Sequence, residues 1–193
     1  RAYDAIMAGS PDLAYKLRNG IPPNRKEFAK YRAFLTGLRQ VSNTPAEFSS
    51  EEKVKPEDAA KIMAAADHVM DHAEKLPDYR GYSYSNYVGS GVVPLQEELN
   101  RRGITTAVFD GTLNDVERKQ IVNDYNSGKI QHLLLTSAAS EGLDLKGTRL
   151  VQMLDPHWNH AKMHQVKARG IRHKSHAHLP EEHRNVHVQH FFS

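Results

Sequence analysis

The sequence has no cysteine and no long apolar run, and each absence excludes a class of protein. Without cysteine, the chain cannot form disulfides, thiolate metal sites or a cysteine nucleophile. No stretch approaches the roughly 20 apolar residues of a membrane span, and the first residues lack the apolar core of a signal peptide. We therefore expect an intracellular protein with no membrane partner, whose chemistry depends on hydroxyl, carboxylate, amine, guanidinium or imidazole groups.

The composition predicts a folded chain with only a weak preference for anionic partners. Its 193 residues suit one domain with at most an added subdomain, and 39% of them are hydrophobic. The 26 basic residues nearly balance the 23 acidic ones, which leaves a formal charge of +3. Nine of the 12 histidines lie in residues 157–190, so this end of the chain gains positive charge as the pH falls through about 6.5.

The first part of the chain has the apolar repeat of helices. Apolar residues recur near a helical period in residues 13–38, and the interruption at 20–23 predicts two helices with a corner between them. A third helix is expected at 57–74, after a polar connection. We therefore expect two units, a helical segment at residues 1–55 and a second domain at residues 56–193.

From residue 79 onward, short apolar runs alternate with helical stretches. Strands are expected at 82–88, 105–109, 130–136, 150–154 and 186–192, with helices at 92–102, 115–126 and 160–168. This alternation predicts an α/β fold with a mainly parallel sheet and helices on both faces. Ligands of such sheets bind at the carboxyl ends of the strands, so the loops that follow the strands are the candidate functional segments.

Two segments in the second half of the chain have residues suited to phosphate groups. Gln165, Arg169 and Arg172 are spaced so that two guanidinium groups can reach one anion, which arginine binds through paired hydrogen bonds. Upstream, an apolar strand leads through small and hydroxyl residues to Gly142 and Asp144. Glycine permits close approach of the backbone to a phosphate chain, and a carboxylate can bind a sugar hydroxyl. Taken alone, the arginine segment would also be explained by a basic surface helix. The upstream segment, taken alone, would also be explained by an ordinary loop between a strand and a helix.

The upstream segment resembles motif V of superfamily 2 helicases, and the segment with the two arginines resembles motif VI. Ser85 and Asn86, after a strand, resemble motif IV, and residues 109–126 resemble the "DGT…R…FN" segment of the same domain. Residues 38–45 resemble the "LRKxCNHP" signature of Snf2-family proteins, and residues 155–159 resemble their "DxxWNP" run. The chain is therefore similar to the C-terminal RecA-like domain of an Snf2-family ATPase, preceded by an Snf2-type helical segment.

The resemblance implies a part in ATP hydrolysis that another domain completes. Arg172 would be the arginine finger and Arg169 a second phosphate contact, while Gln165, Gly142 and Asp144 would bind the nucleotide. The chain has no P-loop motif, so ATP with Mg²⁺ would be held mainly by an N-terminal RecA-like domain of the same polypeptide. The isolated chain is expected to be inactive as an ATPase.

The resemblance also implies a face that binds double-stranded DNA. Hydroxyl and backbone N–H groups would contact the phosphates of one strand at Ser85, Asn86, Gly111, Thr112, Thr136 and Ser137, together with Trp158. Such contacts carry little sequence information, which suits a motor that moves along any sequence. The sequence therefore predicts the second motor domain of an Snf2-like, ATP-dependent double-stranded DNA translocase.

Several alternatives stay open at this point. The chain could be the corresponding domain of a strand-separating DNA or RNA helicase, which would share the arginine pair. It could instead be a nucleic-acid-binding module that does not hydrolyse ATP. His157, His160 and His164 could lie on one helix face and bind a metal ion, but we expect no metal site, because the arginine motif already accounts for that helix.

Overall fold

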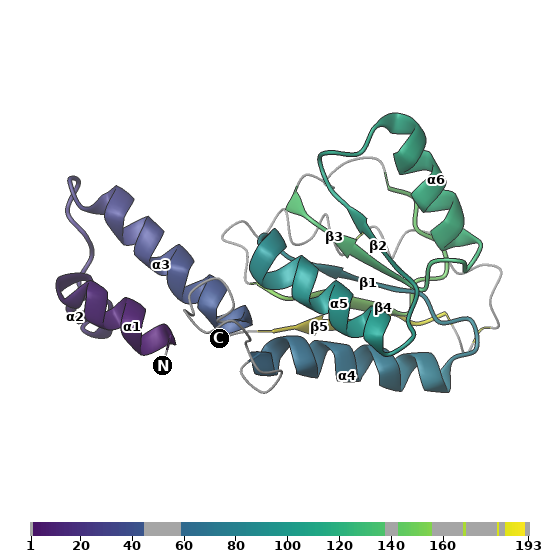
Figure 1. Cartoon of the computed structure of the whole chain (residues 1–193), viewed down its shortest axis with the longest axis horizontal. Coiled ribbons are helices and arrows are strands. Elements are labelled where there is room, and N and C mark those ends of the chain that lie inside the picture. The colour runs from purple at the N-terminus through teal and green to yellow at the C-terminus, as the bar shows by residue number, and fades with distance from the viewer. Residues whose placement is uncertain are drawn as a thin grey trace.

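The fold combines N-terminal helices with a parallel sheet that is flanked by further helices (Figure 1). The computed structural model describes residues 2–44, 59–137, 143–155, 168, 181 and 184–191. Along the chain, the elements are α1 (Ala2–Gly9), α2 (Pro11–Arg18), α3 (Phe28–Asn43), α4 (Ala60–Lys75), β1 (Gly81–Tyr84), the π-helix η3 (Val88–Val92), α5 (Val93–Arg101), β2 (Thr106–Phe109), α6 (Asp115–Asn126), β3 (His132–Leu135), β4 (Leu150–Met153) and β5 (His187–His190).

The sheet has the strand order β2-β3-β1-β4-β5, and each neighbouring pair is parallel. Tyr84 at the end of β1 is in register with Leu135 of β3 and with Met153 of β4. Phe109 at the end of β2 is also in register with Leu135. The carboxyl ends of these four strands therefore lie side by side along one edge. The predicted α/β fold with a parallel sheet is confirmed.

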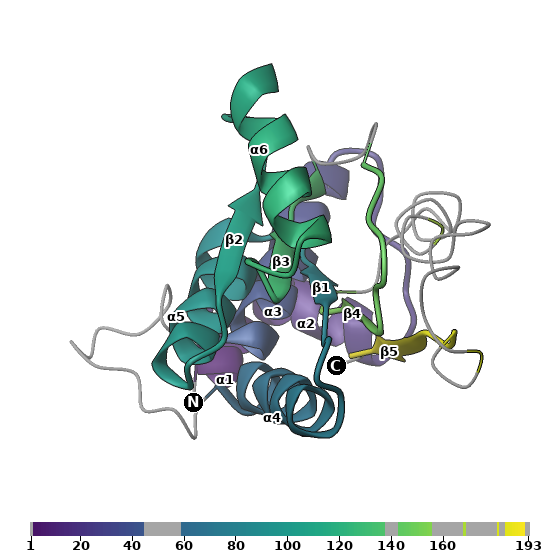
Figure 2. The same ribbon diagram turned by 90° about the vertical axis from the view of Figure 1, so that its right-hand side faces the viewer.

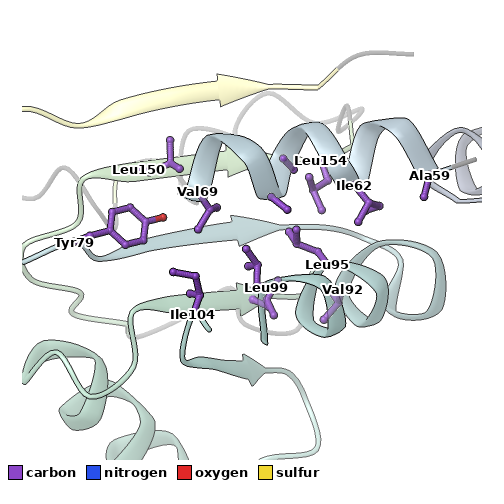
Figure 3. Close-up of a cluster of buried hydrophobic side chains, with 13 residues drawn as sticks. Ala59, Ile62, Val69, Tyr79, Val92, Leu95, Leu99, Ile104, Leu150 and Leu154 are labelled. Carbon is purple, nitrogen blue, oxygen red and sulfur yellow. The ribbon is translucent and has the colours of Figure 1, made fainter. Parts of the chain in front are cut away.

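Helices cover both faces of the sheet (Figure 2). On one face, apolar residues of α4 and α5 pack around Leu134 and Leu150, and Figure 3 shows this cluster. On the other face, Tyr125 of α6 packs with Tyr82 and Leu133. Successive residues of a strand point to opposite faces, so β3 contributes to both cores and is buried along its whole length. Burial of these apolar side chains is the main source of stability for the sheet domain.

The helices α5 and α6 begin or end at local sequence signals. The Asn114 side chain accepts hydrogen bonds from the backbone N–H groups of Val116 and Glu117 at 2.9 and 3.0 Å. The Glu117 carboxylate in turn accepts from the Asn114 N–H at 2.8 Å, which completes a capping box. Gly103 after α5 and Gly128 after α6 have φ of 88° and 82°, a left-handed conformation that glycine adopts without strain. The helix predicted at 115–126 is therefore confirmed.

Some predicted boundaries were wrong. The strand expected at 82–88 ends at Tyr84, because Ser85 bonds to Asp155 and the chain then turns into η3. The region before residue 44 has three helices rather than two, since α2 starts at Pro11, which lacks the N–H that would continue α1. The helix expected at 160–168 lies outside the described residues, apart from residue 168.

The N-terminal helices bury a small apolar cluster of their own. It consists of Met7, Ala14, Phe34 and Leu38. The last helix of this group, α3, also contacts α4 and η3. Residues 45–58, which include the expected boundary between the two units, lie outside the described residues. Within the part of the chain that the structure describes, none of the helices has the length and apolar character needed to cross a membrane.

A row of buried polar side chains crosses the sheet. The Ser83 hydroxyl donates to Gln152 Oε1 at 2.7 Å, and Gln152 Nε2 donates to the Ala65 carbonyl of α4 at 3.0 Å. Since the Ser83 hydrogen is used in this way, His132 Nε2 donates to Ser83 Oγ at 2.7 Å, and Nδ1 accepts from the Tyr79 hydroxyl at 2.8 Å. Burial lowers the pKa of His132 to about 3, so the imidazole is neutral at neutral pH.

We expect His132 to make the stability of the fold depend on pH. Its pKa falls from 6.5 to about 3 on folding, so below pH 6.5 the unfolded chain binds a proton that the folded chain excludes. The free energy of unfolding is therefore unaffected by protonation of His132 above pH 6.5. It decreases as the pH falls from 6.5 toward 3, by up to about 1.4 kcal/mol per pH unit. Urea unfolding at several pH values measures this slope.

The matched variants are His132→Gln and His68→Gln, since His68 is exposed on α4. His132→Gln should reduce the dependence of unfolding free energy on pH between about 6.5 and 5, whatever its effect on stability at neutral pH. His68→Gln should keep the wild-type slope. A wild-type slope in His132→Gln would show that the buried imidazole does not control acid stability.

Candidate functional site

Loops from four neighbouring strands meet at one edge of the sheet, which we call the carboxyl edge. It consists of residues 85–87, 110–112, 136–137 and 154–155, which follow β1, β2, β3 and β4. The parallel register places the starts of these loops next to one another. The sheet therefore brings together the described residues that the sequence predicts to contact nucleic acid, namely Ser85, Asn86, Gly111, Thr112, Thr136 and Ser137.

Asp155 joins three parts of the chain at this edge. The residue is 2% exposed. Its Oδ2 accepts hydrogen bonds from Ser85 Oγ at 2.6 Å and from the Asn86 N–H at 2.9 Å. Its Oδ1 accepts from Asn43 Nδ2 at the end of α3. Hydrogen bonds to an ionised carboxylate are stronger than those between neutral groups, so Asp155 holds the loop after β1 and the end of α3 against β4.

Two titratable groups beside Asp155 have altered pKa values. Burial lowers the pKa of the Lys61 amine, and the negative charge of Asp155 opposes this effect. Lys61 Nζ also donates to the Leu154 carbonyl at 3.4 Å. Burial, followed by the Asp155 charge, raises the pKa of the Tyr87 phenol, while the Arg39 guanidinium lowers it. Lys61 therefore provides a nearby positive charge that partly balances the buried carboxylate.

The loop after β2 is folded by its own side chains and by α6. Thr112 donates to Asp110 Oδ1 from its hydroxyl at 2.6 Å and from its N–H at 2.9 Å, and these bonds lower the pKa of Asp110. Arg118 of α6 donates to the carbonyls of Leu113 at 2.9 Å and Asp110 at 3.3 Å. These bonds define the conformation of the turn and leave Gly111 exposed at its tip.

The predicted nucleic-acid contacts differ in exposure. The exposed residues are Gly111, Thr112 and Ser137. Asn86 is partly buried, and Ser85 and Thr136 are buried. The Ser85 hydroxyl donates to Asp155, and the Tyr87 N–H donates to Ser85 Oγ at 3.1 Å. In this structure Ser85 therefore shapes the loop, and its contact with nucleic acid stays a prediction.

The predicted nucleotide site is described at one residue only. Asp144 is exposed, and its carbonyl accepts from Asn126 Nδ2 at 2.9 Å. With Arg118 and Lys119 of α6, among others, it lines a groove of about 450 Å³. The other predicted site residues lie outside the described residues, namely Gly142, Trp158, Gln165, Arg169 and Arg172. The three histidines considered as metal ligands also lie there, and the described residues contain no group of three potential metal-ligating side chains.

The sequence did not assign roles to Asn43, Lys61 or Tyr87. Asn43 and Asp155 belong to the two segments that carry the Snf2 resemblance, so a signal for both was present. Their bond joins residues 112 positions apart, which no local pattern predicts. Lys61 and Tyr87 have no distinguishing sequence signal, because a helical lysine and a loop tyrosine are common on protein surfaces.

The sequence is similar to a protein family and to individual known proteins. Residues 62–174 match the family described as helicase conserved C-terminal domain. A protein of Acanthamoeba polyphaga mimivirus, named as an ATP-dependent RNA helicase, is 32% identical over 179 residues, which are 93% of this chain and 36% of that protein. A termination factor NPH-I homolog of African swine fever virus is 43% identical over 85 residues, 41% of this chain and 12% of that protein.

The fold also matches a solved structure. The SWI2/SNF2 ATPase core of Sulfolobus solfataricus in complex with dsDNA has a TM-score of 0.71 and 17% identity, over 99% of this chain and 38% of that one. This similarity shows that the chain has the RecA-like fold of Snf2 ATPase C-terminal domains. The chain spans well under half the length of each of these relatives.

Proposed function

Because the chain belongs to the family of helicase conserved C-terminal domains, we propose that it is the second motor domain of an Snf2-like, ATP-dependent translocase of double-stranded DNA. In this proposal, the carboxyl edge binds the phosphates of one DNA strand. The chain also supplies arginines to an ATP site that an N-terminal RecA-like domain of the same polypeptide completes. The isolated chain would then be inactive as an ATPase.

The observation that carries the proposal is the set of uncharged donors at the carboxyl edge. Gly111 and Ser137 expose backbone and hydroxyl groups on neighbouring loops, and Asn86 lies beside them. Thr112 is also exposed, but its hydroxyl and N–H both donate to Asp110, so it would have to release that carboxylate to bind phosphate. Such donors bind phosphate oxygens without reading the bases, which a motor that steps along any sequence requires. Asp155 and the Asp110 turn fix the loops before any ligand arrives, so little ordering free energy is lost on binding.

The arginines of the last motif would act on the nucleotide. Bound ATP with Mg²⁺ supplies the γ-phosphoryl group that is transferred to water. Arg172 would stabilise the negative charge that develops on that group, and Arg169 would provide a second phosphate contact. Gln165 would connect this motif to the cleft. Asp144, near Gly142 in sequence, fits a sugar contact, since its carboxylate is exposed beside a groove.

We also propose that the chain is divided near residue 55. The helices before residue 44 share a small apolar cluster, whereas the elements from α4 onward build the sheet and its two cores. The helical segment would then be an attachment to the motor domain, joined to it through the bond between Asn43 and Asp155.

A strand-separating RNA or DNA helicase is the second candidate function. The mimivirus relative is named as an RNA helicase, and its similarity covers nearly the whole chain. A nucleic-acid-binding module that does not hydrolyse ATP is a further alternative. Binding preference separates the translocase from the RNA helicase, and ATP turnover separates both from the inactive module.

Binding of labelled nucleic acids to this chain tests the proposed DNA face. We expect duplex DNA to bind more tightly than single-stranded DNA or RNA of the same sequence. Ser137→Glu, which places a carboxylate at the carboxyl edge, should weaken duplex binding by about tenfold through repulsion of phosphates. Fluorescence anisotropy at fixed ionic strength measures each Kd.

Ser127→Glu is the matched control for this experiment. Ser127 is also exposed, but it follows α6 at the opposite end of the sheet domain, where the strands begin. The same change of charge there should leave the Kd for duplex DNA within about twofold of wild type. Equal losses in both variants would mean that the carboxyl edge is not the binding face.

A further inference from the structure

One face of α3 presents a line of polar and cationic side chains. Arg32, Thr36 and Arg39 are spaced at i, i+4 and i+7, which places them on one side of a helix. We call this line the α3 stripe. Arg32 and Thr36 are exposed and Arg39 is partly buried, whereas Phe34 and Leu38 are buried on another side of the helix.

The charge of α3 differs from that of the helices that cover the sheet. α3 has three cationic side chains and no acidic one, a formal charge of +3. α4 and α6 each have two lysines or arginines against three acidic residues, and α5 has one against two, so each carries −1 with histidine neutral. The chain as a whole carries only +3. Among the helices that the structure describes, α3 therefore carries the largest positive charge.

The α3 stripe leads into the carboxyl edge. α3 packs against η3, whose N-cap is Tyr87, and Tyr87 immediately follows Asn86 in the loop after β1. Arg39 and Thr36 lie close enough to the Tyr87 phenol to lower its pKa, against the effects of burial and of Asp155. Four residues after Arg39, Asn43 donates to Asp155. Figure 1 shows α3 approaching the sheet with its C-terminal end. The stripe and the loop that contains Asn86 therefore form one continuous surface.

The spacing of the two arginines suits a polyanion with regularly placed charges. A helix rises about 1.5 Å per residue, so Arg32 and Arg39 lie roughly 10 Å apart along α3, about three steps of 3.4 Å along duplex DNA. Arginine binds phosphate oxygens through its planar guanidinium group and stays charged at any physiological pH.

We propose that the α3 stripe is a second contact surface for the phosphate backbone of double-stranded DNA, continuous with the carboxyl edge. This inference rests on the proposed function, because it extends the DNA face from the sheet onto the helical segment. Arg32 contacts phosphate directly, and Arg39, beside Tyr87, connects that contact to the loop after β1. The helical segment thereby lengthens the stretch of duplex that the motor domain holds.

The test measures duplex binding by Arg32→Ala, Arg32→Lys and Lys75→Ala in the whole chain. Lys75 is the control, since it is 69% exposed on α4 and its loss removes the same charge away from α3. We expect Arg32→Ala to weaken binding of a fluorescein-labelled duplex of about 20 base pairs by about three- to tenfold. It should also reduce the slope of log Kd against log salt concentration by about 1. Arg32→Lys should recover most of the affinity, and Lys75→Ala should match wild type.

The outcomes separate this inference from the proposed function. If wild type does not bind duplex DNA, the proposed function fails. If wild type binds and Ser137→Glu weakens binding while Arg32→Ala does not, the carboxyl edge stands and the α3 stripe is overturned as a DNA contact. Thermal unfolding supplies the second readout, since exposed Arg32 should be replaceable without loss of stability. A lowered Tm in Arg32→Ala with an unchanged salt slope would assign the residue to protein packing and overturn the inference.

Discussion

Replacing Arg172 with alanine, in a polypeptide that includes the proposed N-terminal RecA-like domain, is expected to reduce DNA-stimulated ATP turnover by at least about 10³-fold. The physical reason is that a guanidinium group aimed at the γ-phosphate stabilises charge that develops only in the transition state. Nucleotide binding should be retained, because most ground-state contacts to ATP would come from the other domain. Steady-state hydrolysis and binding of a fluorescent ATP analogue measure the two quantities separately.

Arg101→Ala is the control for Arg172→Ala. Arg101 lies at the end of α5, is 68% exposed and pairs with Glu98 of the same helix. Surface pairs of this kind contribute little to stability, so turnover in Arg101→Ala should equal that of wild type. Normal turnover in Arg172→Ala would exclude the arginine-finger assignment, and loss of nucleotide binding would make it a binding residue instead.

Asp155→Ala is expected to lower the free energy of unfolding by about 3 kcal/mol. The change leaves the Asn43 amide, the Ser85 hydroxyl and the Asn86 N–H without the acceptor that they share. Lys61 also loses the negative charge that favours its protonated form. Urea unfolding followed by circular dichroism measures the loss. Duplex binding should weaken as well, because the loop after β1 is no longer held in place.

Two further variants distinguish the buried network from a general effect of charge. Asp155→Asn keeps the shape and one acceptor oxygen, so its loss of stability should be smaller than that of Asp155→Ala. Asp71→Ala removes an acidic residue of α4 that is 51% exposed. Among the described residues, Asp71 forms an ion pair with Lys75 alone. It should change the free energy of unfolding by less than about 1 kcal/mol. Similar losses in Asp155→Ala and Asp71→Ala would contradict the central role of Asp155.

Most of the sheet domain could be predicted because its signals are local. β3 and β4 are short, mostly apolar runs. α6 has an asparagine cap at its start and a glycine just after its end, so the sequence near each of these elements defines it. β1 ends earlier than its apolar pattern suggests. Its boundary depends on the bond between Ser85 and Asp155, residues 70 positions apart.

The candidate site could be predicted in outline but not in its connections. The rule that ligands bind at the carboxyl ends of parallel strands located Gly111, Thr112 and Ser137 correctly on one edge. The rule does not tell which side chains face the solvent and which hold the loops together, since that depends on contacts distant in sequence. Ser85 is the clearest case, because its hydroxyl is buried against Asp155.

The most direct test of the proposed motor function is the nucleic-acid dependence of ATP turnover by the polypeptide that contains this chain and the proposed N-terminal domain. Hydrolysis would be measured without nucleic acid and with saturating duplex DNA, single-stranded DNA or RNA. A translocase of double-stranded DNA should be stimulated most strongly by duplex DNA. Stronger stimulation by RNA would replace the translocase with an RNA helicase, and no stimulation by any nucleic acid would contradict a motor function.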